Sequence, residues 1–134
     1  MNINEVIIRS EPDLVTMIGK ALPIIMSQLS LNSLPKIKIQ KNIIDHNQAT
    51  FGQYVNDENT VYVAIDNRHP VDVLRTLAHE LVHYKQDLND ELDHTSGATG
   101  SHAENEAHAV AGVIMRHINK KYPEFLHADN IELP

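Results

Sequence analysis

Apolar residues recur at helical spacing near the start of the chain, at Leu14, Ile18, Leu22, Ile25 and Leu29. Residues three and four positions apart lie above one another on a helix, so these side chains form one apolar face. Ser10 is suited to cap such a helix and Pro12 to its first turn. Pro23 has no backbone N–H to donate to the preceding turn, so we expect it to kink or divide the helix.

The pattern then changes to alternation of polar and apolar residues over residues 36–41, which predicts a half-buried strand. Residues 51–55 and 60–65 are two further strand candidates. They flank a polar segment of hairpin length, residues 56–59. We therefore expect a small sheet of three strands, mostly antiparallel, before the next helix.

Helical spacing returns over residues 70–88, where Pro70 suits the first helical position and Asp72 complements the helix dipole. Residues 89–100 are polar and include two glycines, which predicts a loop. A last helix is expected from Ser101 or His102 to about residue 119. Its several alanines allow close approach to another helix, and the residues after 122 are expected to form an irregular tail.

These elements predict one α+β domain over residues 1–134: an N-terminal helix, a small three-stranded sheet and two further helices. The chain has no cysteine, so a zinc ion would have to be held by histidines and carboxylates. The formal net charge of -7 disfavours a broad nucleic-acid surface, which requires an excess of Lys and Arg. No apolar run is long enough for a signal peptide or a membrane span, which predicts a cytoplasmic protein with no membrane partner.

The helix over residues 70–88 contains the motif His79-Glu80-x-x-His83. Residues four apart share one helix face, so both imidazoles can bind one metal ion. Glu80 lies at the border of that face, where its carboxylate can reach a water on the metal. Two histidines, an acidified water and a carboxylate to take its proton are the elements of a zinc hydrolase. Two surface histidines on an amphipathic helix are the alternative, but the apolar face lies on a different side of the helix.

A catalytic zinc site usually has three protein ligands and one open position. The metzincin pattern is excluded because Gln86 and Asn89 stand where it requires glycine and histidine. The residues alone leave several candidates for the third ligand open, namely His94, His102, Glu104, Glu106 and His108.

Asn105-Glu106-Ala107 resembles the Asn-Glu-Ala segment of thermolysin-type gluzincins, in which the glutamate is the third zinc ligand. The second half of the chain is also similar to small metallopeptidases encoded by large tailed bacteriophages. The runs that carry this similarity are residues 76–86, 99–101, 104–107 and 111–116.

The resemblance implies a minimal gluzincin with one zinc ion held by His79, His83 and Glu106, and with Glu80 as general base. Its substrate would be a peptide or protein, cleaved in the host cytoplasm if the chain is phage-encoded. Glu104 is an alternative ligand or a partner that orients a ligand histidine.

Thermolysin-type enzymes have a larger C-terminal domain that supplies transition-state donors, and this chain has no room for one. A donor would have to come from a backbone N–H or from Tyr84, His94, His102 or His108.

Two other functions are consistent with the same residues. One is a zinc-stabilised binding or regulatory module without turnover, in which a fourth protein ligand closes the site. The other is a SprT-like protease acting on DNA-bound proteins, whose motif is followed by a later histidine; Gly100-Ser101-His102 is the weak similarity here. The acidic charge argues against the latter, and the sequence leaves the oligomeric state open.

Overall fold

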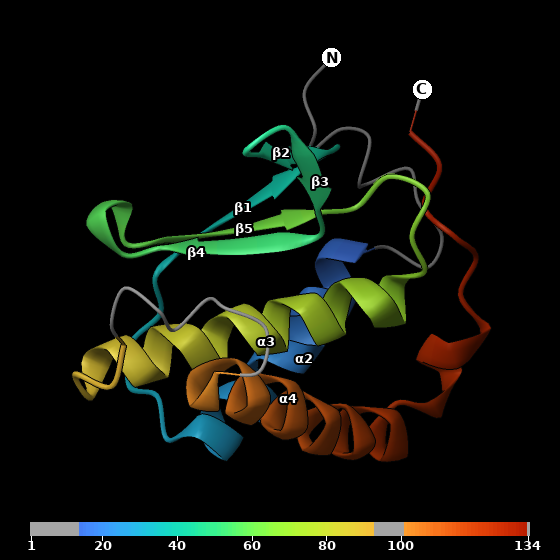
Figure 1. Cartoon of the computed structure of the whole chain (residues 1–134). Helices are drawn as coiled ribbons and strands as arrows, with labels where there is room; N and C mark the ends of the chain where they lie inside the picture. Colours follow the sequence, from blue (N-terminus) through green and yellow to red (C-terminus); the bar gives the residue numbers. More distant parts are fainter. Residues whose placement is uncertain (1–13, 93–100, 134) are drawn as a thin grey trace.

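The computed structural model describes residues 14–92 and 101–133. The fold is α+β, as predicted (Figure 1). Its elements in chain order are α2 (Leu14–Leu29), β1 (Lys36–Gln40), β2 (Ile43–Asp45), β3 (Gln48–Thr50), β4 (Gly52–Val55), β5 (Thr60–Ala64), α3 (Pro70–Leu88) and α4 (His102–Lys121), with short 3-10 turns at η1 (Asn56–Glu58) and η2 (Pro123–His127).

The three predicted strands form one sheet in the order β1-β5-β4. β1 pairs with β5 in parallel, whereas β4 pairs with β5 antiparallel and occupies an edge. A second, two-stranded antiparallel sheet of β2 and β3 was not predicted. Its strands are too short to show alternation, and its turn is made by His46 and Asn47, both at positive φ (50° and 64°). Antiparallel pairing predominates over the two sheets together, in agreement with the prediction.

The helix α3 is the centre of the fold, because it contacts β4, β5, α2 and α4. Figure 1 shows the sheet above α3, α4 below it and α2 crossing behind it. The apolar face predicted for this helix is fully buried, with Leu74, Leu77, Ala78 and Leu81 all inaccessible to solvent. The small residues of α4 allow the predicted close approach, since Ala107 and Ala111 are buried against the core.

The bounds of α3 and α4 are close to those predicted from the sequence, but the effect expected of Pro23 on α2 differs. α3 begins at Pro70 and ends at Leu88, as predicted, and α4 extends two residues beyond the predicted end at 119. α2 continues through Pro23, so the proline does not divide the helix. The proposed cap at Ser10 lies outside the described residues. None of the described helices combines the length and apolar character needed to cross a bilayer.

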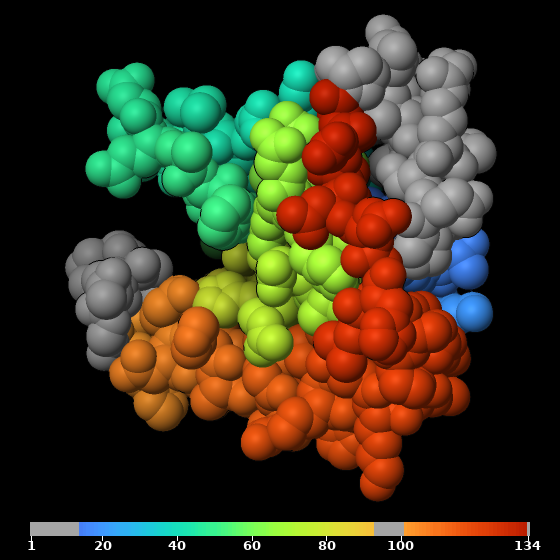
Figure 2. All heavy atoms as spheres, turned by 90° about the vertical axis from the view of Figure 1, so that its right-hand side faces the viewer, coloured from blue at the N-terminus to red at the C-terminus, as the bar shows by residue number. Residues whose placement is uncertain are grey.

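The residues after α4 form the irregular tail that the sequence predicts. Figure 2 shows this segment rising from the end of α4 along the loop that precedes α3. Ile131 is buried and forms two backbone hydrogen bonds there, donating to Arg68 O (2.8 Å) and accepting from Asn67 N (2.7 Å). The tail therefore fixes the start of the motif helix to the rest of the core.

Candidate metal centre

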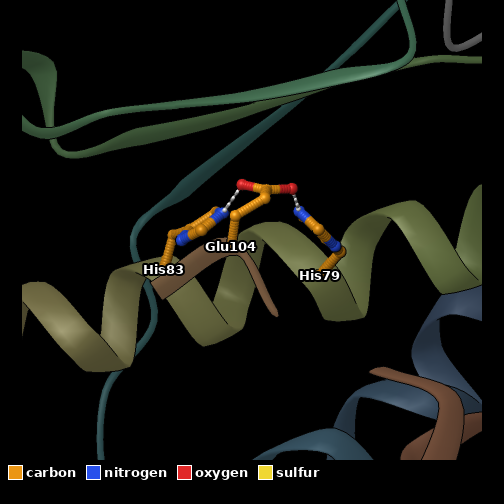
Figure 3. Close-up of side chains that lie close together, drawn as sticks. All are labelled: His79, His83 and Glu104. Atoms are coloured by element: carbon orange, nitrogen blue, oxygen red, sulfur yellow. Dashed lines mark hydrogen bonds and ion pairs between the residues drawn. The ribbon is translucent and has the colours of Figure 1, made fainter. Parts of the chain in front are cut away.

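Three side chains from two helices meet above α3 (Figure 3). His79 Nε2 lies 2.8 Å from Glu104 Oε1, and His83 Nε2 lies 3.1 Å from Glu104 Oε2. One ligand atom from each residue falls within 4.8 Å of the others. The two histidines are one turn apart on α3, as their spacing predicts, and Glu104 reaches them from α4. The described residues therefore contain a group that is able to bind a metal ion.

The first turn of α4 brings Glu104 to this position. Ser101 caps the helix, and its Oγ accepts a hydrogen bond from Glu104 N at 3.1 Å. Glu104 is the third residue of α4, so its carboxylate also lies near the positive end of the helix dipole. Ala103 and Ala107 are buried on either side of it in sequence, which lets the helix start approach α3 closely.

The expected third ligand, Glu106, is not the carboxylate that meets the histidines. Two residues along a helix correspond to a rotation of about 200°, so Glu106 and Glu104 project from different sides of α4. Glu106 Oε1 instead accepts a hydrogen bond from Gln86 Nε2 at 2.9 Å. Among the described residues, the group close enough to bind a metal ion is therefore His79, His83 and Glu104, and the set with Glu106 stays an expectation from the motif.

Gln86 connects this group to Glu106. Its Nε2 donates both to Ala103 O (3.0 Å) and to Glu106 Oε1 (2.9 Å), and its Oε1 lies 2.8 Å from His83 Nδ1. The side chain is almost completely buried, with 2% of its surface exposed. Sequence reasoning missed this residue, although its position one turn after His83 was a signal that it could contact the imidazole.

The other predicted site residues have different positions. Tyr84 is buried and packs within the fold, with its hydroxyl 2.9 Å from Ser33 Oγ and its ring edge-on to that of Tyr54. His102 is exposed and lies outside the ligand group. His108 is exposed beside the site, its ring centre 6.2 Å from that of His79. His94 lies outside the described residues.

Glu80 lies beneath the edge strand β4 and is 8% exposed. A Cβ placed on Gly52 would come within 3.1 Å of Glu80 Oε2 and 2.4 Å of Thr76 Cγ2, so only glycine allows the strand to lie this close. Burial, the largest cause, and the charge of Glu104 together raise the pKa of Glu80 to about 8, although a backbone hydrogen bond from Tyr54 acts in the opposite direction. Glu80 therefore has the raised basicity that suits a proton acceptor.

The ligand group and Glu80 face a cleft of ≈ 1220 Å³ between β4, α3 and the start of α4. At one end of the cleft Tyr54 Oη donates to Asp87 Oδ2 (2.5 Å), which ties the edge strand to α3. Burial and this carboxylate raise the pKa of the Tyr54 hydroxyl. The cleft is open to solvent on the side of the histidines, which retain 17% and 12% of their side-chain surface.

The donor set suits zinc. Two imidazoles and one carboxylate are common zinc ligands, and cysteine, which would favour softer metals, is absent from the chain. Both imidazoles direct Nε2 toward the Glu104 carboxylate, and burial lowers the pKa of His79, which favours the neutral form that binds metal.

Comparison of the chain with protein-family models, curated protein sequences and solved structures finds no match. The similarity to gluzincins therefore depends on the motif residues alone, and the function must be argued from the site.

Proposed function

We propose that the protein is a zinc-dependent peptidase in which Glu80 is the general base. The observation that supports this most directly is the meeting of His79, His83 and Glu104 in an open cleft beside a buried carboxylate. Among the described residues three ligand atoms converge, which leaves a coordination position for water and substrate.

A bound zinc ion would polarise the scissile carbonyl and lower the pKa of a water from 15.7 to about 7. The chain supplies the remaining steps. Glu80 takes the proton of the attacking water on its carboxylate and delivers it to the leaving amine. The burial that raises the Glu80 pKa increases its affinity for that proton, and with a divalent cation bound nearby the carboxylate would be ionised before attack.

The edge strand offers a way to hold the substrate. β4 is hydrogen-bonded to β5 on one side only, and it forms one wall of the cleft. An extended peptide adds naturally to such an edge through main-chain hydrogen bonds. Because Gly52 brings β4 close to Glu80, a peptide on this edge would place a carbonyl near both Glu80 and the ligand group.

Digestion of a protected peptide library tests the proposal. We expect the zinc-loaded protein to cleave peptides, a chelator to stop cleavage and added zinc to restore it. Glu80→Gln should abolish cleavage while one zinc ion per chain stays bound, because the side chain is not in the ligand group. Glu91→Gln, an exposed site after α3, is the matched control. Turnover by Glu80→Gln would contradict the assigned base, and lack of zinc uptake would remove the hydrolase proposal.

The alternative, a module in which zinc serves only folding, makes a different prediction about the fourth coordination position. A structural site is closed by a fourth protein ligand, whereas the described residues provide three. The test replaces zinc with cobalt and adds a small anion or a hydroxamate. Either ligand would change the visible spectrum of the cobalt protein only if the fourth coordination position is free. An unperturbed spectrum together with no cleavage would favour the structural module.

A further inference from the structure

A second groove, of ≈ 370 Å³, adjoins the cleft between α3 and α4. Its charged lining is entirely basic, although the chain has a formal net charge of -7. The lining residues are Arg75, His108, Ala109, Gly112, Met115, Arg116 and Asn119.

This groove adjoins the cleft at Arg75 and His108 and follows the two helices away from the ligand group. Arg75 precedes His79 by four residues on α3, and His108 follows Glu104 by four residues on α4. The helices run in opposite directions (Figure 1), so both basic residues lie on the same side of the site, about one helical turn of 5.4 Å away. Arg75 and His108 line the cleft as well as the groove, so a ligand that fills the cleft can continue into it.

The basic side chains are available to a ligand. Arg75 and Arg116 are exposed, and neither forms an ion pair or hydrogen bond with another described residue. Arg68 is different, since its guanidinium donates to Ala64 O and Thr76 Oγ1 and so has a structural role.

The floor of the groove can also receive a peptide backbone. A Cβ placed on Gly112 would meet no atom within 4 Å, so the space above it is open. Asn119 Oδ1, at the far end of the lining, is buried and has no hydrogen-bond partner among the described residues.

We propose that this groove binds an acidic segment of the peptide substrate, so that the enzyme prefers sites with Asp or Glu a few residues from the scissile bond on one side. This inference rests on the proposed function for its link to cleavage. Each exposed cation is worth about two- to fivefold in affinity, and the preference should weaken as salt is raised.

The test compares the cleavage sites of wild type, Arg75→Glu/Arg116→Glu and Lys36→Glu/Lys120→Glu in one peptide library, identified by mass spectrometry. Lys36 and Lys120 are exposed residues outside this groove, and the second double variant is the charge-matched control. We expect enrichment of acidic residues on one side of the site in wild type and control, and its loss or inversion towards Lys and Arg in Arg75→Glu/Arg116→Glu. The same profile in all three proteins would overturn the proposal.

A binding experiment separates failure of the groove from failure of the peptidase. Fluorescent peptides of equal length, one rich in Glu and one with Gln at those positions, are titrated into the zinc-loaded Glu80→Gln protein. Tighter binding of the acidic peptide, lost in the variant that also carries Arg75→Glu/Arg116→Glu, supports the groove even if no peptide is cleaved. Equal binding of the two peptides contradicts it.

A separate set of contacts concerns the metal ligands. Gln86 uses both amide hydrogens, on Ala103 O and Glu106 Oε1, so its orientation is determined and its Oε1 must accept from His83 Nδ1. A proton on Nδ1 leaves Nε2 of the neutral ring unprotonated, and Nε2 is the atom that faces Glu104. We infer that Gln86 is a positioning residue that holds His83 in the tautomer required for metal binding and fixes the first turn of α4 against α3.

Zinc affinity and imidazole NMR test this role without any measurement of turnover. Gln86→Leu should weaken zinc binding by about 10- to 100-fold. It should also remove the protected Nδ1–H signal of His83 from the zinc-loaded protein. Gln86→Glu combined with Glu106→Gln keeps an acceptor for Nδ1 and a hydrogen bond between residues 86 and 106, so it should retain that signal. This makes the test independent of whether the leucine variant folds. Wild-type affinity in Gln86→Leu, or loss of the signal in the double variant, would refute the assignment.

Discussion

The most specific prediction concerns which carboxylate, Glu104 or Glu106, binds the metal together with the two histidines. Glu104 contacts both histidine Nε2 atoms, at 2.8 and 3.1 Å, whereas Glu106 contacts Gln86. Replacing each glutamate separately by glutamine removes one negative charge from the same helix and preserves side-chain volume. Glu104→Gln should therefore lose zinc, and Glu106→Gln should keep it.

The expected magnitudes follow from these contacts. Zinc binding to a structural site is worth about 10–16 kcal/mol, so one ligand of three contributes about 3–5 kcal/mol, or roughly 10²- to 10⁴-fold in affinity. Glu104 is also the anionic residue of the group, so its replacement should weaken zinc binding by an amount near the upper end of this range. Glutamine at 106 still offers an oxygen to Gln86 Nε2, so that variant should lose less than about 1 kcal/mol.

Competition for zinc with a chelator of known affinity at neutral pH measures both variants against wild type. Urea unfolding with and without zinc accompanies it, because zinc should stabilise wild type and Glu106→Gln but not Glu104→Gln. The reverse ranking, with zinc lost from Glu106→Gln and retained by Glu104→Gln, would refute Glu104 as the third ligand and support Glu106 instead.

Two further predictions concern Glu80 and the strand above it. Gly52→Ala places a Cβ within 2.4 Å of Thr76 Cγ2 and should lower the free energy of unfolding, measured in urea, by about 1–3 kcal/mol. The control is Gly19→Ala, in open space on α2, which should not destabilise the protein. Equal effects of the two substitutions would contradict the close packing at Gly52. Because the pKa of Glu80 is raised in the folded protein to about 8, its contribution to stability is present below about pH 4.5 and lost as pH rises through 8. The metal-free wild type should therefore lose stability relative to Glu80→Gln between about pH 5 and 9, and a pH-independent difference would show that Glu80 ionises freely.

Much of the fold follows from signals that are local in the sequence. Pro70 at the first helical position and a continuous apolar face determined the start, end and buried side of α3. The spacing of His79 and His83 placed two ligands on one helix face for the same reason, since helix geometry depends only on nearby residues. Alternation located β1, and the polar segment of hairpin length, residues 56–59, lies between β4 and β5 as expected.

Tertiary contacts decided the rest. Parallel pairing of β1 with β5 and burial of Glu80 under Gly52 join residues far apart in sequence, and neither leaves a periodic signal. The third ligand depended on the rotation of α4 about its axis, which is set by the packing of Ala103 and Ala107 against α3. A shift of two residues rotates the helix face by more than half a turn, so a motif resemblance alone selected Glu106, whereas packing of the two helices brought Glu104 to the histidines.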